Sequence, residues 1–117
     1  MDWKSNSGGG VSGGLELAHA NNITVNRGAS IGTHVVLFKG VTIGSVRSGE
    51  KKGCPQIGNA VAICTISVVV GNITIGDDVL IAANSFVNFN VPAHSVVIGN
   101  PAHIHHKENA SADYCSR

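Results

Sequence analysis

A repeat of six residues runs through the middle of this 117-residue chain. Aliphatic side chains recur at this interval, with one longer step, at Val25, Ile31, Leu37, Ile43, Ile57, Ile63, Val69, Ile75, Ile81 and Val87. Four residues after most of them stands a second small or branched residue, as Ala29 stands after Val25. A fixed internal period constrains the fold more strongly than local propensity does, because every repeat must form the same structural unit.

A period of six matches neither the alternation of a plain β-sheet nor the 3.6-residue period of an amphipathic helix. The repeats are rich in Val, Ile and Thr, which favour strands, so each repeat is expected to form a short strand followed by a corner. Three such strands would make one triangular coil, and stacked coils would form a solenoid with the aliphatic residues inside. The sequence therefore predicts an all-β domain, a parallel β-helix of about four coils.

The interval sorts the repeats into three faces. The first face begins at Ile31, Ile57 and Ile75, the second at Val25, Ile43, Val69 and Val87, and the third at Leu37, Ile63 and Ile81. On the first face the next residue is always glycine, at Gly32, Gly58 and Gly76. A column of glycines at one corner is expected where the backbone needs a positive φ or a close approach. A β-sandwich of short strands would explain neither this column nor the constant interval.

Composition limits the remaining possibilities. Hydrophobic residues make up 43% of the chain but aromatic residues only 4%, which suits the interior of a narrow prism. The net charge of +1 gives no reason to expect binding to nucleic acid or to an acidic membrane surface. No apolar stretch is long enough to cross a bilayer or to serve as a signal peptide. The three cysteines have no CxxC spacing and fit a reducing compartment, so the cytoplasm is the expected location.

The repeat also divides the chain. Residues 1–14 are rich in glycine and serine and are expected to form a flexible leader, and residues 15–104 the β-helix domain. Residues 105–117 are expected to form a polar, frayed tail. His103, His105 and His106 stand close together in sequence where this tail begins, but without fixed geometry they do not predict a metal site.

The longer step in the repeat is an insertion, which predicts one extended loop at residues 45–56. It reads SVRSGEKKGCPQ and carries Arg47, Lys51 and Lys52. Loops that leave a rigid scaffold often carry function, although a solvated surface loop would have the same composition.

One histidine stands where the period would place a core residue. Counting back six residues from Val25 leads to His19, at a position that elsewhere in the repeat is aliphatic. Two interpretations are open from the pattern: the solenoid has not begun and His19 is a loop residue, or His19 is kept for its chemistry.

Three features together resemble a known family. The six-residue repeat, the loop segment VTIGSVRSGEKKGCPQIGNAV and the closing segment VPAHSVVIGNPAHI resemble the left-handed β-helix acyltransferases, and within them the catalytic domain of serine O-acetyltransferases. The resemblance covers about His19 to Ile104. It implies a left-handed coil, a homotrimer, and acetyl-CoA bound as co-substrate in clefts between neighbouring prisms, with no metal.

The resemblance also implies roles for particular residues. The segment LAHANNITVN matches the family segment with the catalytic histidine, so His19 would be the general base that removes a proton from the attacking hydroxyl. Backbone N–H groups at Gly44 and Ser45 match the coenzyme-contacting stretch and would stabilise an oxyanion. The remaining coenzyme positions are Thr65 and Ala83 for the pantetheine arm, and Pro101 and Ala102 for the adenine end.

The chain departs from the family pattern at three other positions. Ala18 replaces an aspartate before the catalytic histidine, Cys54 replaces a loop histidine that helps to hold serine, and Ile66 is bulkier than the small residue expected near the coenzyme. We therefore expect free L-serine to be a poor substrate. The sequence favours an acetyl-CoA-dependent acetyltransferase acting on a hydroxyl or amine of a small acceptor, and it does not name that acceptor. The alternative is a non-catalytic trimeric β-helix module that keeps the fold, with or without coenzyme binding.

Overall fold

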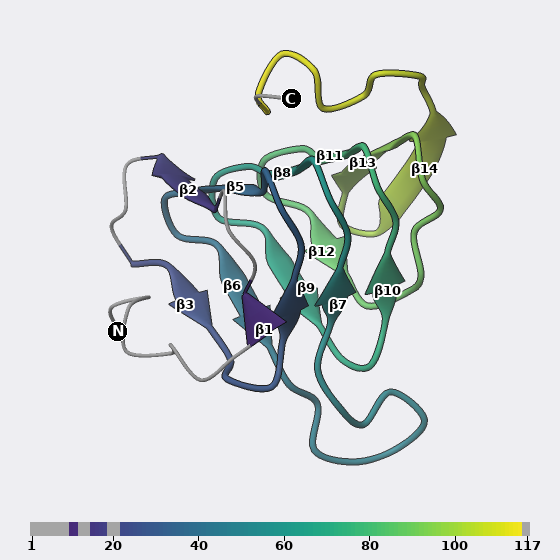
Figure 1. The fold of residues 1–117 in the computed structure, drawn as a ribbon. Helices are drawn as coiled ribbons and strands as arrows, with labels where there is room; N and C mark the ends of the chain where they lie inside the picture. The colour runs from purple at the N-terminus through teal and green to yellow at the C-terminus, as the bar shows by residue number, and fades with distance from the viewer. Residues whose placement is uncertain (1–9, 12–14, 19–21, 116–117) are drawn as a thin grey trace.

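The computed structural model describes residues 10–11, 15–18 and 22–115, and these form short strands (Figure 1). The strands are β1 (Gly10–Val11), β2 (Glu16–Ala18), β3 (Thr24–Val25), β4 (Ser30–Ile31), β5 (Val36–Phe38), β6 (Thr42–Gly44), β7 (Gln56–Ile57), β8 (Val61–Ile63), β9 (Val68–Val70), β10 (Thr74–Ile75), β11 (Val79–Ile81), β12 (Phe86–Val87), β13 (Ser95–Gly99) and β14 (Ala102–His106). Within these ranges no helix has the length and hydrophobicity needed to cross a membrane.

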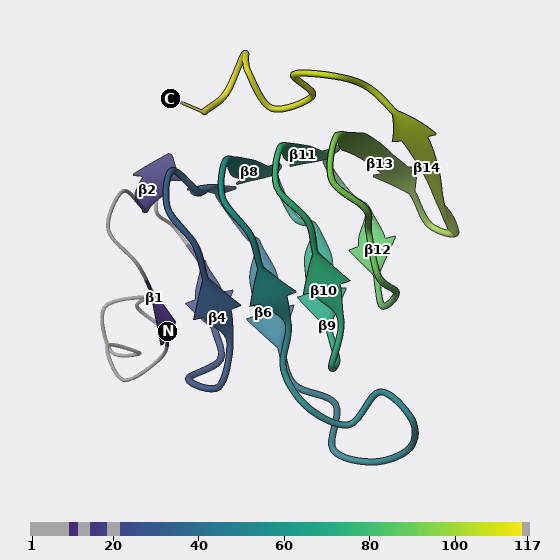
Figure 2. The same ribbon diagram turned by 45° about the vertical axis from the view of Figure 1, so that its right-hand side comes forward.

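The strands form three sheets, one on each side of a triangular prism (Figures 1 and 2). Sheet A has the order β1-β4-β7-β10, sheet B the order β14-β13-β11-β8-β5-β2, and sheet C the order β12-β9-β6-β3. The pairings between the described strands are parallel except that of β13 with β14. The chain passes from A to B to C in every coil, so the predicted parallel β-helix of about four coils is confirmed.

The core contains the residues that the repeat predicts. The aliphatic repeats are buried on all three faces, and Leu37, Ile43, Ile63 and Ile81 have no exposed surface. The second position of each repeat is buried as well, even where it is serine. Ser67 and Ser85 both donate their hydroxyl protons to the carbonyl oxygen of Ala82, at 2.8 and 2.7 Å, which satisfies these polar groups inside the prism.

The glycine column is explained by close approach and not by a positive φ. A Cβ atom on Gly76 would lie 2.5 Å from the backbone nitrogen of Ala93 and 2.9 Å from its Cα atom. The left-handed positions of this corner are instead held by residues with side chains, including Ala60 (φ 56°) and Asp78 (φ 56°). Glycine is therefore needed because the next coil leaves no room for a side chain.

The register of the first coil differs from the count of six. β2 pairs with β5 so that Leu17 lies opposite Leu37 and Ala18 opposite Phe38. Five residues (19–23) connect β2 to β3, whereas three (39–41) connect β5 to β6, so the regular count fails by two at this corner. Leu17 is therefore the residue in register with the core residue Leu37, and the count of six back from Val25 does not hold across this corner. His19 itself lies outside the described residues.

Residues 105–115, the described part of the predicted tail, do not fray. After β13 the chain turns back as the antiparallel strand β14 and then crosses over sheet B (Figure 2). His103, His105 and His106 lie on β14 with exposed side chains. Beyond β14, Ala110, Ser111 and Cys115 are buried. The prediction of a frayed tail is wrong because the groups that hold this segment belong to the β-helix, more than thirty residues earlier in the chain.

Candidate functional site

One corner of the prism contains two of the predicted coenzyme-binding residues. The strands of sheet B end there before the chain enters sheet C, and we call it the B–C corner. The register of β5, β8 and β11 places Lys39, Thr65 and Ala83 above one another at this corner. Backbone hydrogen bonds connect the stack, from the Ile66 nitrogen to the Lys39 oxygen (3.0 Å) and from the Asn84 nitrogen to the Thr65 oxygen (2.9 Å). Thr65 is half-buried and Ala83 is exposed.

The closing motif lies at the end of the same corner. The register of β11 with β13 brings Gly99 next to Ala83, and Gly99 donates its backbone N–H to the Ser85 hydroxyl at 2.9 Å. Pro101 and Ala102 follow in the turn into β14, and Pro101 is exposed. The structure thus brings four of the predicted residues, Thr65, Ala83, Pro101 and Ala102, to one edge of the prism.

Gly44 and Ser45 lie at a different corner. β6 ends at Gly44, where sheet C gives way to the loop and sheet A, and we call this the C–A corner. Gly44 accepts a hydrogen bond from the Gly71 nitrogen (3.2 Å), and the Ser45 hydroxyl accepts one from the Asn26 amide (3.5 Å). The width of sheet C separates the two corners, so a single chain does not bring Gly44 and Ser45 together with Thr65 and Ala83.

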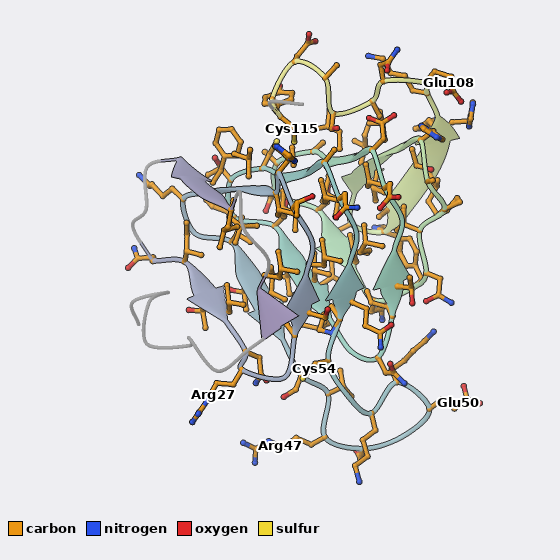
Figure 3. The ribbon with its side chains drawn as sticks, in the orientation of Figure 1. Arg27, Arg47, Glu50, Cys54, Glu108 and Cys115 are labelled. Carbon is orange, nitrogen blue, oxygen red and sulfur yellow. The ribbon has the colours of Figure 1, made fainter. Side chains whose placement is uncertain are left out.

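The inserted loop projects from the C–A corner and is ordered at its base (Figure 1). Val46 and Gly53 exchange two backbone hydrogen bonds, and the Lys51 oxygen accepts one from the Asn72 nitrogen at 2.8 Å. Cys54 is half-buried where the loop rejoins the prism, and its thiol donates to the Asn26 side-chain oxygen at 3.2 Å. The side chain of Arg47 points away from the prism (Figure 3), so the loop presents its positive charge to solvent.

Ile66 has an unusual conformation at the B–C corner. Its φ is 65° and its side chain is 57% exposed. The equivalent positions of the neighbouring coils are Gly40 (φ 78°) and Asn84 (φ 62°), which adopt left-handed conformations more readily. A β-branched residue there is strained, and strain of this kind is concentrated at functional sites. The sequence indicated the bulk of Ile66 but not its backbone conformation.

The predicted general base cannot be placed directly, because His19 lies outside the described residues. The residue before it, Ala18, is described and is the last residue of β2. Ala18 pairs with Phe38, which leads directly to Lys39 at the B–C corner. The strand that precedes His19 therefore ends at the same corner as Thr65 and Ala83.

Sequence reasoning missed the residues that cover sheet B near this corner. The ring of Tyr114 packs edge-on against Phe38, with ring centroids 5.9 Å apart. Cys64, on the outer side of sheet B, is half-buried, and burial together with the nearby Cys115 raises the pKa of its thiol. No signal in the sequence connects residues 114–115 to this face, because the repeat has ended before them.

Among the described residues, no group of three or more His, Cys, Asp or Glu side chains could hold a metal ion.

Comparisons with known proteins find relatives that cover most of this chain. No family model matches the chain. A serine acetyltransferase of Staphylococcus xylosus is 39% identical over 90 residues, which are 77% of this chain and 42% of that protein. A serine acetyltransferase of Staphylococcus aureus is 38% identical over the same length. The chain thus spans less than half the length of these relatives.

Solved structures with the same fold include complexes. Serine acetyltransferase from Brucella abortus in complex with coenzyme A superimposes with a TM-score of 0.75 at 32% identity, over 84% of this chain and 40% of that one. Serine acetyltransferase from Neisseria gonorrhoeae in complex with serine superimposes with a TM-score of 0.72 at 33% identity, over 80% of this chain and 39% of that one. The prism is accordingly a left-handed parallel β-helix.

Proposed function

Because this chain belongs, through its six-residue repeat domain, to the left-handed β-helix acyltransferases and resembles serine acetyltransferases among them, we propose that it transfers the acetyl group of acetyl-CoA to the hydroxyl of a small acceptor. The observation that carries the proposal is the edge on which Thr65, Ala83, Pro101 and Ala102 lie in the order expected for an extended coenzyme arm. A solved relative is bound to serine, so L-serine is the first acceptor to test. This choice runs against the expectation drawn from Ala18 and Cys54.

The B–C corner suits the pantetheine arm for a simple geometric reason. Neighbouring coils lie about 4.8 Å apart, so a thin extended chain can run along the corner and contact the backbone of successive coils. Thr65 and Ala83 are small and leave that backbone accessible. Ile66 stands beside this path and would restrict the space for the arm.

We place the complete site between copies of the chain in a homotrimer. Gly44 and Ser45 lie at the C–A corner, and a neighbouring prism can bring its own C–A corner against the B–C corner of the first. A contact between two different surfaces generates a closed ring when the rotation is 120°. Exposed apolar side chains on sheets B and C, Phe86 (37%) and Ile98 (48%), support burial against a second copy.

The proposed chemistry is a direct transfer. The His19 imidazole removes the proton of the acceptor hydroxyl while that oxygen attacks the thioester carbonyl carbon. Backbone N–H groups at Gly44 and Ser45 stabilise the oxyanion of the tetrahedral intermediate. The intermediate then collapses with cleavage of the carbon–sulfur bond, and the imidazolium gives its proton to the sulfur of CoA. The three cysteines are free, which supports a reducing compartment such as the cytoplasm.

The test compares turnover with coenzyme binding. The purified chain should release CoA from acetyl-CoA when L-serine or another hydroxyl acceptor is added. His19→Ala should lower kcat by about 10²–10⁴-fold, the usual contribution of a general base, without changing CoA binding measured by calorimetry. His105→Ala, which removes an exposed imidazole from β14, is the matched control. CoA binding without turnover of any acceptor would favour the non-catalytic module, and absence of CoA binding would contradict the proposal.

A further inference from the structure

Residues 107–115, which we call the C-terminal strap, cross the outer face of sheet B from β14 back toward β2 (Figure 2). A buried carboxylate holds the strap in place. Asp78 is 4% exposed, and it accepts hydrogen bonds from the nitrogens of Ala110 (3.1 Å) and Ser111 (3.0 Å) and from the Ser111 hydroxyl (3.0 Å). The Cys115 nitrogen donates in turn to the Ser111 oxygen at 2.9 Å. The end of the strap therefore has a defined position over the sheet.

The side chain of Cys115 lies against the outer surface of β5 and β8. Cys115 is 5% exposed and packs in one cluster with Val36 of β5 and Ala62 of β8. These two residues are directly opposite each other in the register of the strands. The preceding residue, Tyr114, packs edge-on against Phe38 with ring centroids 5.9 Å apart. The tip of the strap thus covers outward-facing residues of both strands.

Cys64 belongs to the same outer surface. It follows Ile63, which has no exposed surface and faces the core, so the side chain of Cys64 faces outward as that of Ala62 does. The register of β5 with β8, carried one residue further, places Cys64 opposite Phe38. Cys64 is therefore next to Ala62 and next to Phe38, the two residues on which the tip of the strap packs.

The two thiols also influence each other. Burial raises the pKa of the Cys64 thiol, and the neighbouring Cys115 raises it further. An effect between charges falls off with distance, which agrees with two sulfurs on one surface. Cys64 is half-buried and Cys115 is buried, so Cys64 is the more accessible of the two. Figure 3 shows Cys54, the third cysteine, on the opposite side of the prism from Cys115.

We propose that Cys64 and Cys115 are a redox-active pair, and that a low-molecular-weight disulfide such as glutathione disulfide oxidises them to a bridge between the strap and sheet B. The Cys64 thiolate attacks one sulfur of glutathione disulfide, which gives a mixed disulfide and releases one glutathione. The Cys115 thiolate then attacks the Cys64 sulfur and releases the second glutathione. Each leaving glutathione takes up the proton that a cysteine has lost. Two protein thiols are thus oxidised while one glutathione disulfide is reduced to two thiols.

The bridge requires only the tip of the strap to move. Two outward residues in succession on one strand, such as Ala62 and Cys64, have Cα atoms about 6.7 Å apart. The Cα atoms of a disulfide are about 4.4–6.8 Å apart, so a side chain that packs on Ala62 needs only a short shift to reach Cys64. Cys115 is four residues beyond Ser111, so the anchor at Asp78 can stay in place. In a reducing compartment such a bridge is transient, and the inference does not depend on the proposed acetyl transfer.

The experiment identifies which cysteine pairs with Cys115. The reduced full chain is incubated with glutathione disulfide at about pH 8.5, because the thiolate is the attacking species. Remaining thiols are then blocked with iodoacetamide. Trypsin leaves Cys115 in the peptide 108–117, and Cys54 and Cys64 together in the peptide 53–107. A link between these two peptides, reversed by dithiothreitol, reports the bridge.

Two variants assign the partner in that link. Cys64→Ala should slow the linkage at least about tenfold, because it removes the thiol that is held close to Cys115. Cys54→Ala is the matched control and should link at the wild-type rate. Fragmentation of the linked wild-type peptides should place the bridge at Cys64, which gives the same answer without a substitution. In concentrated urea the preference should disappear, since all three cysteines then pair by chance.

Other results would overturn the proposal. Linkage in folded Cys64→Ala at the wild-type rate, or a bridge that fragmentation places at Cys54, would mean that Cys64 is not the partner. Glutathione adducts without a link between the peptides would mean that the tip of the strap does not reach Cys64. Links that form only between separate chains would exclude a pair within one chain.

Discussion

Replacing Asp78 by asparagine should release residues 107–115, the C-terminal strap that follows β14 and lies over sheet B, without unfolding the β-helix. Asparagine has the shape of aspartate and readily adopts the left-handed conformation found here (φ 56°), so the turn before β11 should persist. The variant loses the negative charge, however, and its amide NH₂ group would face the N–H donors of Ala110 and Ser111. The perturbation is therefore confined to the contact between the turn and the strap.

The magnitude follows from the hydrogen bonds that are lost. Asp78 accepts three from the strap, two from backbone nitrogens and one from the Ser111 hydroxyl. A hydrogen bond to a charged group contributes about 1.5–3 kcal/mol, and the amide oxygen of asparagine can keep one of the three. A net loss of about 3 kcal/mol shifts the equilibrium for opening the strap by roughly 100-fold.

The buried thiol of Cys115 measures this opening. Alkylation by iodoacetamide requires the strap to lift, and when closing is fast the labelling rate follows the population of the open form. Trypsin cleaves after Lys107 and releases residues 108–117 as one peptide, so mass spectrometry can follow Cys115 separately from Cys54 and Cys64. We expect Asp78→Asn to label Cys115 about 100-fold faster than the wild type does.

Asp77→Asn is the matched control. Asp77 is the preceding residue, is exposed, and accepts a hydrogen bond from the Asn59 nitrogen at 2.7 Å instead of holding the strap. This variant should label Cys115 at the wild-type rate. A rate for Asp78→Asn within threefold of the wild type would refute the reasoning, since the strap would then be held by contacts other than the carboxylate.

Three further predictions concern other parts of the structure. Ile66→Asn should raise the free energy of unfolding by about 1 kcal/mol, because asparagine tolerates a φ of 65° better than a β-branched residue does. Chemical denaturation measures this change, with Ile98→Asn as the control. A loss of stability in Ile66→Asn, or an equal gain in Ile98→Asn, would count against strain at this corner. Burial raises the pKa of the Cys64 thiol, so this thiol ionises at a higher pH in the folded chain than in the unfolded chain. The fold should keep its full stability at neutral pH and lose part of it above about pH 8.5, where the unfolded thiol ionises first. The free energy of unfolding should therefore fall less between pH 8 and pH 10 in Cys64→Ala than in the wild type. Phe86→Glu should convert a trimer of the 12.0 kDa chain into monomers in light scattering, whereas Gln56→Glu on sheet A should not; a wild-type monomer would contradict the assembly.

The sequence by itself determined the coils, the three faces and the core. Each repeat buries its own aliphatic residue against the coils directly before and after it, so the pattern that forms the structure is local and periodic. Leu37, Ile63 and Ile81 could therefore be assigned to one face from their spacing and are buried together there. The same regularity placed Thr65 and Ala83 at one corner.

The period was insufficient wherever the number of residues in a corner changed. The connection after β2 is two residues longer than the connection after β5, so that Leu17 is in register with Leu37, and no count along the chain reveals this without the pairing of β2 with β5. The reason for the glycine column was also undecided in the sequence. Only the distance from Gly76 to the backbone of Ala93 shows that close approach, and not a positive φ, requires glycine there.

Only the tertiary structure decided how the candidate site is distributed and what covers it. Gly44 and Thr65 come from different corners of the prism, a separation that depends on how the coil closes and not on distance in sequence. The strap is positioned by Asp78, whose carboxylate bonds to Ser111 across 33 residues of sequence. A polar tail carries no periodic signal for such a contact, because its stability comes from a few donors that meet one buried charge after the β-helix has formed.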